Sequence, residues 1–416
     1  MVTPPTIAIF GALDTKGIEF AFLKTEIEKK GFKAFVVDTG VLGGPAFKPD
    51  VTREEVAQAG GEKLSTLVER NDRGQAIAVM TQGAAIIARK LHADGKCNGI
   101  ISMGGGAGTV IGTSAMRALP VGVPKLMVST VASGDVGAYV GTSDITMMPS
   151  IVDVAGLNRI SRLIISNAAA AVCGMASNVV TESEDQKPLI AATMFGNTTP
   201  AVDHARHILE KNGYEVLVFH ATGTGGKTME ALIRDGYFVG VLDITTTEWA
   251  DELCGGVLSA GPDRLSAAAE TGLPQVVVPG CIDMCNFWAP NTVPDRYKAR
   301  IFYHWNPNVT LMRTTPEENA QLAKIFAEKL NPALGAVTVM IPRRGFSQLD
   351  LEGKPFFCPE ANHAFIDSLK ANLRKDIPII EMDVDINDPS FSGKSAEILL
   401  SMLQKELNSE KQKNQS

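Results

Sequence analysis

Short apolar runs alternate along this chain with longer segments that have the spacing of amphipathic helices. Ile7–Phe10 is the first run, a helical pattern reaches about Lys30, and Phe35–Asp38 is the second run. Short runs of β-branched and other apolar residues, bounded by turn residues, are typical of strands buried on both faces. Gly99–Met103 and Lys125–Val128 continue the alternation. The pattern predicts an α/β protein with parallel sheets.

Helical patterns fill the intervals between these runs. Ala76–His92 has a strong helical pattern, the loop Gly104–Thr109 leads into a helix ending at Arg117, and a long helix is expected at Val152–Ser177. The second half repeats the alternation and then enters a stretch rich in Pro, Trp and Asn, Cys281–Pro307, which we expect to be irregular. Beyond it we expect helices Glu317–Leu330, Ala361–Leu373 and Ser392–Leu407, strands Ala336–Ile341 and Ile377–Asp383, and a polar tail from Asn408.

Segments of the two halves resemble one another in the same order. Ile27–Phe32 aligns with Leu209–Tyr214 at an offset of 182 residues, and Ile7–Ile9 aligns with Leu189–Ala191 at that same offset. This repeated order indicates two related halves. Two further matches pair Asp94–Ser102 with Asp235–Asp243 and Gly122–Thr130 with Gly272–Gly280.

The chain of 416 residues is too long for a single core. A charged segment that ends in proline, Thr181–Pro188, is typical of a linker. We therefore predict an N-terminal domain at residues 1–180, a linker at 181–188 and a C-terminal domain at 189–416. Each domain is expected to be a doubly wound, Rossmann-like parallel-sheet domain, with the loops at the carboxyl ends of its strands facing an interdomain cleft.

Composition narrows the possible partners. The net charge of −7 gives no broad attraction to nucleic acid or to anionic membranes, so we expect neither as a partner. No apolar run reaches the ~20 residues of a membrane helix. The N-terminus lacks a signal-peptide pattern, so we expect a cytoplasmic protein. The six cysteines are scattered and are expected to be buried free thiols.

One glycine-rich stretch, His220–Glu230, has the order strand, turn and helix that places backbone N–H groups and a helix dipole on one spot. It is close to a phosphate-binding P-loop, since Gly226, Lys227 and Thr228 are present. Ala221 stands where the first glycine of that motif belongs. An anion site is therefore favoured over a P-loop hydrolase.

A second glycine loop, Gly104–Thr109, follows the predicted strand Gly99–Met103. Successive glycines leave backbone N–H groups unobstructed, which suits a phosphate or a carboxylate. The spacing departs from a dinucleotide fingerprint because the final glycine falls one residue late, at Gly112. A tight structural turn is the alternative interpretation. Lys16 and Lys227 each begin a helix after a turn and could add positive charge to such sites, or could be ordinary surface residues.

Three side chains are candidates for acid–base chemistry. His220 ends a predicted strand beside the glycine-rich stretch. Asp243 and Glu248 flank a threonine-rich turn and could act as a pair or hold hydrated Mg²⁺. The alternative for all three is helix capping or the orientation of a loop. The chain has no nucleophile elbow or Ser-His-Asp order that would indicate acyl transfer.

Taken together, these loops resemble the ATP-binding family of two-domain proteins of bacteria, fungi and plants that is named after tomato's mosaic-virus resistance protein. The resemblance extends over about residues 6–407. It is carried by Asp14–Lys16, Ser102–Gly106 with Thr109, His220–Gly223 with Gly225, Gly226, Met229 and Glu230, Asp243–Thr245, and Asp385–Pro389 with Phe391.

The resemblance implies two Rossmann-like domains, a homodimer, and an ATP and Mg²⁺ site on the glycine loops, with the metal ligands unassigned. Three hypotheses stay open: a cytoplasmic nucleotide-binding protein, an enzyme acting on a small carboxylate- or phosphate-bearing metabolite with His220, Asp243 or Glu248 as acid or base, and a non-catalytic regulatory module. The candidate cofactor-binding residues are Asp14, Thr15, Lys16, Gly104, Gly105, Gly106, Thr109, Ser129, Thr130, Asn197, Gly223, Gly225, Gly226 and Lys227.

Overall fold

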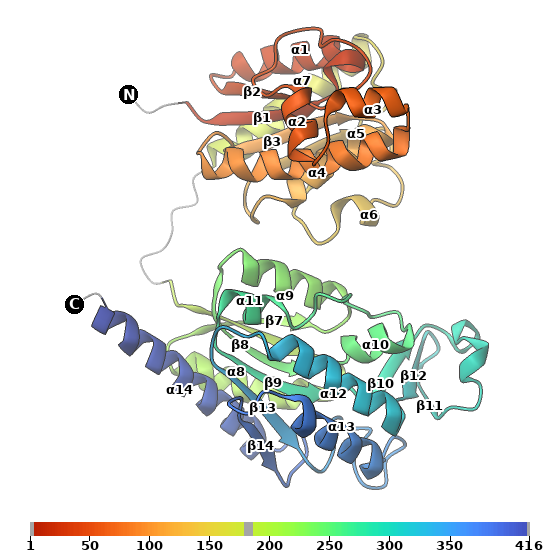
Figure 1. Ribbon diagram of the computed structural model, residues 1–416, viewed down its shortest axis with the longest axis vertical. Coiled ribbons are helices and arrows are strands. Elements are labelled where there is room, and N and C mark those ends of the chain that lie inside the picture. Colours follow the sequence, from red (N-terminus) through yellow and green to blue (C-terminus); the bar gives the residue numbers. More distant parts are fainter. Residues whose placement is uncertain (1–3, 179–185, 414–416) are drawn as a thin grey trace. The chain divides into compact units, whose positions relative to one another are not determined.

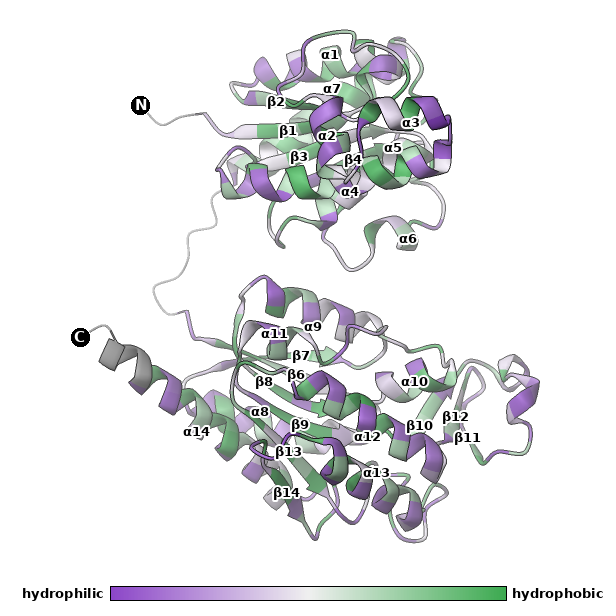
Figure 2. Cartoon of the chain, viewed as in Figure 1, coloured by the Kyte–Doolittle hydropathy of each residue, from purple (hydrophilic) through white to green (hydrophobic). Residues whose placement is uncertain are grey.

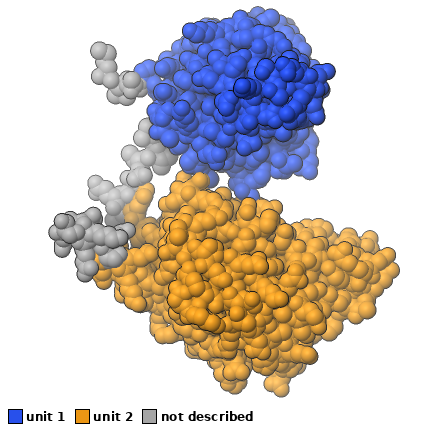
Figure 3. Space-filling view, viewed as in Figure 1, with its two compact units in different colours: residues 1–182 blue, residues 183–416 orange. Residues whose placement is uncertain are grey.

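The computed structural model describes residues 4–178 and 186–413, with side chains as far as residue 408. The chain forms two compact units, residues 1–182 and 183–416 (Figure 3). Residues 181–185 of the predicted linker lie outside the described residues. Each unit is an α/β domain built on a parallel sheet, which confirms the predicted fold class.

The first unit has a five-stranded parallel sheet in the order β2-β1-β3-β4-β5. Figure 1 labels β2, β1 and β3 of this sheet. One sheet face packs on α2, α3, α4 and α5, and the other packs on α1 and α7. The strands are β1 (Thr6–Gly11), β2 (Lys33–Asp38), β3 (Gly99–Gly104), β4 (Lys125–Ser129) and β5 (Thr146–Pro149). The helices are α1 (Leu13–Glu28), α2 (Arg53–Ala59), α3 (Leu64–Arg70), α4 (Arg73–Ala93), α5 (Gly106–Arg117), α6 (Gly137–Val140) and α7 (Arg159–Ser177).

Alternate residues of the strands enter the two cores. Ala8 and Phe10 face the α4 and α5 side, whereas Ile7 and Ile9 face α1 and α7. Both sheet faces are therefore apolar, as expected for a parallel sheet covered by helices. Figure 2 shows the strands as mainly hydrophobic and the hydrophilic residues as concentrated on the helices.

The second unit has a six-stranded parallel sheet in the order β14-β13-β9-β8-β6-β7. Helices α8 and α14 cover one face, and α9, α11, α12 and α13 cover the other. The strands are β6 (Leu189–Met194), β7 (Glu215–His220), β8 (Phe238–Thr245), β9 (Gln275–Gly280), β13 (Val337–Pro342) and β14 (Ile379–Met382). The helices are η1 (Gly196–Thr198), α8 (Thr199–Lys211), α9 (Thr224–Arg234), α10 (Glu248–Cys254), α11 (Ala267–Thr271), η2 (Pro290–Thr292), η3 (Asp295–Tyr297), α12 (Pro316–Leu330), α13 (Pro359–Asn372) and α14 (Pro389–Lys413).

The expectation that Cys281–Pro307 is irregular was wrong. This stretch contributes β10 (Met284–Phe287) and β11 (Phe302–Asn306), which pair on either side of β12 (Val309–Arg313) in an antiparallel sheet. Each strand has only four or five residues, and the prolines and asparagines between them dominate the local pattern. The pairing depends on partners far along the chain, which a local pattern does not contain.

The helix expected at Val152–Ser177 begins later, at Arg159. Asn158 caps it by accepting from the backbone N–H groups of Ile160 and Ser161, at 2.9 Å each. Residues 150–158 instead form a loop, in which Ile151 and Gly156 have positive φ angles of 65° and 80°. A positive φ is an outlier for a β-branched residue such as Ile151. The apolar sequence therefore did not indicate that residues 150–158 would be a loop.

The two parallel sheets have the same order over five strands. Reading from β2, the first sheet is β2-β1-β3-β4-β5, and the second is β7-β6-β8-β9-β13 with β14 added at the edge. The offset of 182 residues carries Lys33–Asp38 onto Glu215–His220, the bounds of β2 and β7. The matched segments of the sequence therefore occupy equivalent positions in the two sheets.

Two further predictions from the sequence concern membrane helices and cysteines. Among the described residues one helix, α7, is long and apolar enough to cross a membrane by length and composition, although no run of that kind was expected. One face of α7, including Ile165 and Val172, packs into the core beneath the sheet, which accounts for its apolar character in the fold. All six cysteines are free thiols; five of them are buried, as predicted, and Cys358 is partly exposed.

Candidate functional site

The N-terminus of α5 is made of glycines and has no side-chain cap. Gly105 is the N-cap residue, and Gly106, Ala107 and Gly108 form the first turn. The first N–H groups of a helix have no partner within the helix, so this end presents free donors and the positive end of the helix dipole. A Cβ on Gly106 would meet no atom within 4 Å, which shows that this residue faces open space. The geometry suits an anion.

A pocket of about 300 Å³ lies at this helix end. Gly104, Gly105 and Gly106 line it together with Thr15 and Lys16 from the start of α1, so the structure brings these five predicted residues together. A second, more apolar pocket of about 520 Å³ shares residues with the first. The shared lining residues are Ala12, Thr15, Thr39, Arg73, Ala107 and Gly108.

Two cations line the glycine pocket. Lys16 has non-helical backbone angles within α1, and its Nζ donates to the carbonyl oxygen of Val154 in the loop 150–158. Arg73 is the first residue of α4, is exposed, and makes no hydrogen bond or ion pair with any of the described residues. Arg73 was not singled out from the sequence, because an arginine after a short helix looks like an ordinary surface residue.

Asp14 has a structural role that the sequence did not indicate. Its Oδ2 accepts from the backbone N–H groups of Val41, Leu42 and Gly43, at 3.0, 2.8 and 3.3 Å. These bonds fix the loop after β2, which lines the apolar pocket. Asp14 therefore shapes the pocket through this loop. Beside it, Oδ1 of Asp38 accepts from Leu13 and Gly40, and burial raises the pKa of Asp38.

Thr109 and Ser129 lie beneath the glycine loop. Oγ1 of Thr109 donates to the carbonyl oxygen of Gly105 at 2.8 Å and lies 2.6 Å from Oγ of Ser129. Ser129 is the last residue of β4, so this pair ties the start of α5 to the neighbouring strand. Thr130 is exposed and lines a separate pocket with Ser129. Thr109 thus supports the glycine loop from below, and Thr130 lies beside this loop.

The glycine-rich stretch of the second unit already holds an anion, and the anion belongs to the protein. Oε1 of Glu248 accepts from the backbone N–H groups of Gly223 and Gly226, at 2.7 and 3.0 Å. A Cβ on Gly226 would lie 2.2 Å from Oε2 of Glu248, and one on Gly225 would lie 1.9 Å from the carbonyl oxygen of His220. These glycines therefore permit close packing, and Glu248 occupies the site that the sequence offered to a phosphate.

Arg264 joins this glutamate to two further carboxylates. Its Nε donates to Oε2 of Glu248 at 2.7 Å, and its Nη2 donates to Oδ1 of Asp243 at 2.7 Å. Glu230 lies 3.4 Å from Nη1 and accepts from the N–H groups of Leu265 and Ala267. We call Arg264, Asp243, Glu248 and Glu230 the arginine cluster. Its members are 1–4% exposed.

The charges of the arginine cluster are set by burial and by one another. Burial raises the pKa of Glu248 and of Glu230, although Arg264 acts in the opposite direction. Burial acts to lower the pKa of Arg264, but Asp243, Glu248 and Glu230 outweigh it and hold that pKa above its usual value. Asp243 and Glu248 are enclosed and bound to Arg264, so the structure does not favour the acid–base pair or the Mg²⁺ ligands considered from the sequence.

The remaining predicted residues are dispersed over the second unit. His220 is exposed at the end of the edge strand β7, with its ring centroid 5.5 Å from that of Phe195. Lys227 is exposed on α9. Asn197 is buried, its amide nitrogen 3.7 Å from the sulfur of Met284. Among the described residues, no group of three or more His, Cys, Asp or Glu side chains is arranged to hold a metal ion.

The structure defines a protein of two α/β units with an open, glycine-lined pocket in the first. Profiles of the uncharacterised protein family UPF0261 match both units: its N-terminal domain matches residues 5–181 and its C-terminal domain matches residues 187–403. The chain belongs to this family.

Relatives support this assignment along nearly the whole chain. A UPF0261 protein of Clostridium tetani is 51% identical over 400 residues, covering 96% of this chain and 99% of that protein. The tomato ToMV susceptible protein tm-1(GCR26) is 41% identical, covering 96% of this chain, and the ToMV resistance protein Tm-1(GCR237) is 37% identical, covering 94%. This chain spans 56% and 54% of those two tomato proteins. The family resemblance inferred from the loops is confirmed.

Solved structures add no functional argument. The UDP-N-acetylglucosamine 2-epimerase of Rickettsia bellii aligns over 96% of each chain with 8% identity and a TM-score of 0.23.

Proposed function

We propose that this protein binds a nucleotide, with ATP as the first candidate, in its N-terminal unit. The observation that carries the proposal is that the uncapped glycine turn at the start of α5 lines a pocket that shares six lining residues with an apolar one. Phosphates would lie against the N–H groups of Gly106 to Gly108, and a base would lie among the apolar side chains of the second pocket.

The apolar pocket has the size and chemistry for a planar base. Three buried residues line it: Leu67 on α3, Met80 on α4 and Ile111 on α5. Leu42 and Val68, which are exposed, also line it. Leu42 is 77% exposed and Val68 is 47% exposed. A bound base would remove such apolar surface from water at roughly 25 cal/mol per Å².

Charge in the glycine pocket also supports a phosphate ligand. Arg73 has no partner among the described residues, so its guanidinium can pair with a phosphate without breaking an existing ion pair. Lys16 brings a second positive charge, while its Nζ also holds the loop 150–158. Mg²⁺ commonly uses one or two carboxylates together with phosphate oxygens, and Asp153, which lines the same pocket, fits that need.

The test is the substitution Gly106→Pro. Proline is favoured at the first position of a helix and lacks only the N–H group, and Gly105 before it already has an extended backbone (φ −82°, ψ −160°). Losing one charge-assisted hydrogen bond should weaken ATP and pyrophosphate binding by about 10- to 100-fold in calorimetry. Gly106→Ala, which keeps the N–H group, should bind normally.

Outcomes that contradict the proposal are defined by the same measurements. If neither ATP nor pyrophosphate binds the wild-type protein at millimolar concentration with Mg²⁺, the proposed function fails. If Gly106→Pro and Gly106→Ala bind ATP alike, the ligand does not use the start of α5.

We infer from the family resemblance that the protein acts as a cytoplasmic homodimer. Light scattering after size-exclusion chromatography measures the mass of the assembly. A mass equal to that of one chain would contradict the proposed homodimer.

A further inference from the structure

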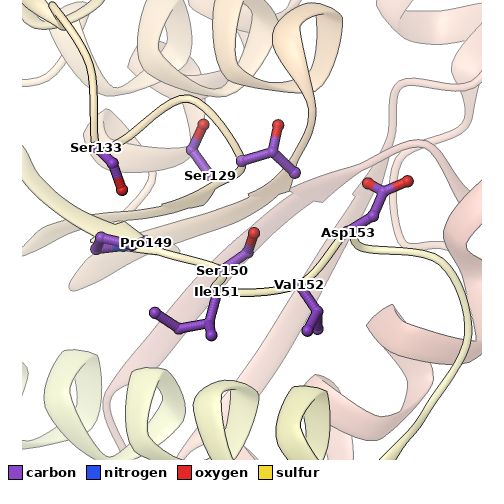
Figure 4. Close-up of a pocket in the computed structure, with 8 residues that line it drawn as sticks. Ser129, Ser133, Pro149, Ser150, Ile151, Val152 and Asp153 are labelled. Atoms are coloured by element: carbon purple, nitrogen blue, oxygen red, sulfur yellow. The ribbon is translucent and has the colours of Figure 1, made fainter.

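A third pocket in the first unit adjoins the glycine pocket. It has a volume of about 410 Å³ and lies between the turn after β4 and the segment after β5 (Figure 4). The turn contributes Ser129, Thr130 and Ser133, and the segment contributes residues 149–153. Asp153 lines both this pocket and the glycine pocket. We call the third pocket the serine pocket.

Ser150 is a buried residue whose hydroxyl lines the serine pocket and is not used by the fold. The residue is 5% exposed, and its hydroxyl makes no hydrogen bond with any of the described residues. Its backbone is fixed, because its N–H donates to the carbonyl oxygen of Ser129 at 3.1 Å and its carbonyl oxygen accepts from Val152 at 2.7 Å. Because this hydroxyl lines the pocket and has no protein partner, a ligand group in the pocket can form a hydrogen bond with it.

The neighbouring backbone is strained. Ile151, between these two bonds, has a φ of 65°, and its side chain is 69% exposed. A β-branched residue in this conformation is held there by its surroundings at an energetic cost. Ser150 and Asp153 line the pocket from either side of this residue and Val152. In Figure 4 the Ser150 hydroxyl and the Asp153 carboxylate point to one side of the segment, and the Ile151 and Val152 side chains point to the other.

The chemistry of the lining selects a class of ligand. Four hydroxyl groups and one carboxylate line the serine pocket, and its lining includes no lysine, arginine or histidine. The hydroxyl of Ser129 is already paired with Thr109 and accepts from the N–H of Val131, which leaves those of Thr130, Ser133 and Ser150 for a ligand. Asp153 forms no ion pair with a described residue, so a second anion here would meet an uncompensated negative charge. Hydroxyl groups and a carboxylate can pair with the hydroxyl groups of a polyol, while the apolar side chains contact its C–H groups.

We propose that the serine pocket binds a neutral polyhydroxylated moiety, with Ser150 and Asp153 as its hydrogen-bond partners. The inference rests on the proposed function in one respect, because it places this moiety next to the phosphates held by α5. The moiety can be a separate sugar-like molecule or a group carried on the phosphate ligand itself. Asp153 faces both pockets and would contact the hydroxyl group nearest to the phosphate.

The experiment measures binding of two sets of probes to the full chain by saturation-transfer NMR and calorimetry. Free D-glucose, D-ribose and myo-inositol form the first set, and glucose 1-phosphate and ribose 5-phosphate form the second. Ser150→Val removes the hydroxyl and fills the space beside it, and should weaken binding of the preferred probe by about tenfold. Ser143→Ala, in the same unit and outside the lining of the serine pocket, is the matched control.

The two sources of the moiety give different results. Binding of a free polyol that depends on Ser150 and survives Gly106→Pro identifies a separate molecule. Binding of a sugar phosphate that is weakened by both Ser150→Val and Gly106→Pro identifies a group carried on the phosphate ligand. Thermal unfolding of Ser150→Val within a few degrees of wild type would show that the loss reflects the site and not the fold.

Three outcomes would overturn the inference. The first is pyrophosphate binding without binding of any hydroxylated probe, which leaves the proposed function intact. The second is equal binding of the probes by wild type and a folded Ser150→Val variant. The third is binding of ethylammonium without Mg²⁺ in preference to every hydroxylated probe, which would show that the lining selects cations and not hydroxyl groups. Binding of polyols without binding of ATP or pyrophosphate would instead remove the proposed function and leave the serine pocket.

Discussion

The two units share a strand order and differ at the carboxyl ends of equivalent strands. At the end of β3 and directly after it, the first unit has Gly104, Gly105 and Gly106, which open onto a pocket. The aligned positions after β8 are Thr245, Thr246 and Thr247, all fully buried. In the second unit the backbone N–H groups of Thr245 and Thr246 donate to Oγ1 of Thr193 and to the carbonyl oxygen of Gly280, and the three hydroxyls donate to neighbouring carbonyl oxygens. One framework therefore presents free donors in one copy and consumes them in the other.

The glycine turns at Gly105–Gly108 and at Gly223–Gly226, which we call the anion cradles, also differ between the two units. The first unit leaves the N–H groups at the start of α5 free of any side-chain cap, whereas the second fills its cradle at Gly223 and Gly226 with Glu248. A glycine-rich turn before a helix indicates where an anion can lie. It does not reveal whether the anion is a ligand or a side chain from elsewhere in the chain.

The largest expected effect tests whether the second unit depends on its internal charges. Arg264→Met would leave Asp243, Glu230 and Glu248 buried without their cation, and should lower the free energy of unfolding by about 3–5 kcal/mol. Urea unfolding with hydrogen exchange of peptides from each unit would locate the loss in residues 183–416. Arg70→Met, which removes an exposed pair with Glu62 in the first unit, should cost no more than about 1 kcal/mol. Equal losses of unfolding free energy in the two variants would contradict the prediction that the second unit depends on its buried charges.

A second test uses the pH dependence of the second unit. Asp251 is fully buried at the start of α10, and burial raises its pKa from 3.8 to about 7. Between those values the folded state binds more protons than the unfolded state, so stability falls as pH rises from about 4 to 7. The expected loss is on the order of 4 kcal/mol, from about three pKa units.

Asp251→Asn should reduce this pH dependence without abolishing it, because burial also raises the pKa of Asp283, Glu230 and Glu248 in the same unit. The amide can keep accepting from Leu258 and Asn286 through one oxygen, and Asn286 has a free Oδ1 that can accept from the new NH₂ group after its own amide turns. Urea unfolding at pH 5 and pH 8 would measure the difference between variant and wild type. A wild-type protein whose second unit gains stability over that range would contradict the assigned shift.

The smallest expected effect compares matched glycines in the two cradles. Gly226→Ala places a Cβ 2.2 Å from Oε2 of Glu248 and should destabilise the second unit by about 1–3 kcal/mol. Gly106→Ala meets no atom within 4 Å and should change stability by less than about 1 kcal/mol. Thermal unfolding of the two variants gives the comparison. A destabilising Gly106→Ala together with a neutral Gly226→Ala would show that the cradles have been assigned the wrong way round.

The sequence was sufficient for the framework of both units. Buried strands such as Ile7–Phe10 and Lys125–Val128 were found because their apolar runs are continuous and bounded by turn residues. The repeat was visible because equivalent strands retain local patterns. The antiparallel sheet of β10, β11 and β12 was missed because its pairing is non-local and its strands are short.

The site was predicted less completely than the framework. The sequence placed Gly104 to Gly106 and Lys16 among the candidates, and the structure brings them into one pocket. It could not show that Glu248 reaches Gly223, because those residues are 25 positions apart and nothing local encodes the contact. Arg264, Arg73 and Ser150 were missed for the same reason: each acquires its role through the residues that the fold places around it.

The contact between Gly226 and Glu248 has a consequence for how this sequence can vary. A side chain at Gly226 displaces the glutamate, a loss of the glutamate leaves Arg264 with fewer counter-charges, and a loss of Arg264 leaves Asp243 unpaired. These positions can therefore change only together, even if no molecule ever binds there. A search for other proteins that uses the His220–Glu230 signature would recover chains with a shared folding requirement, whereas packing places no such requirement on Gly106.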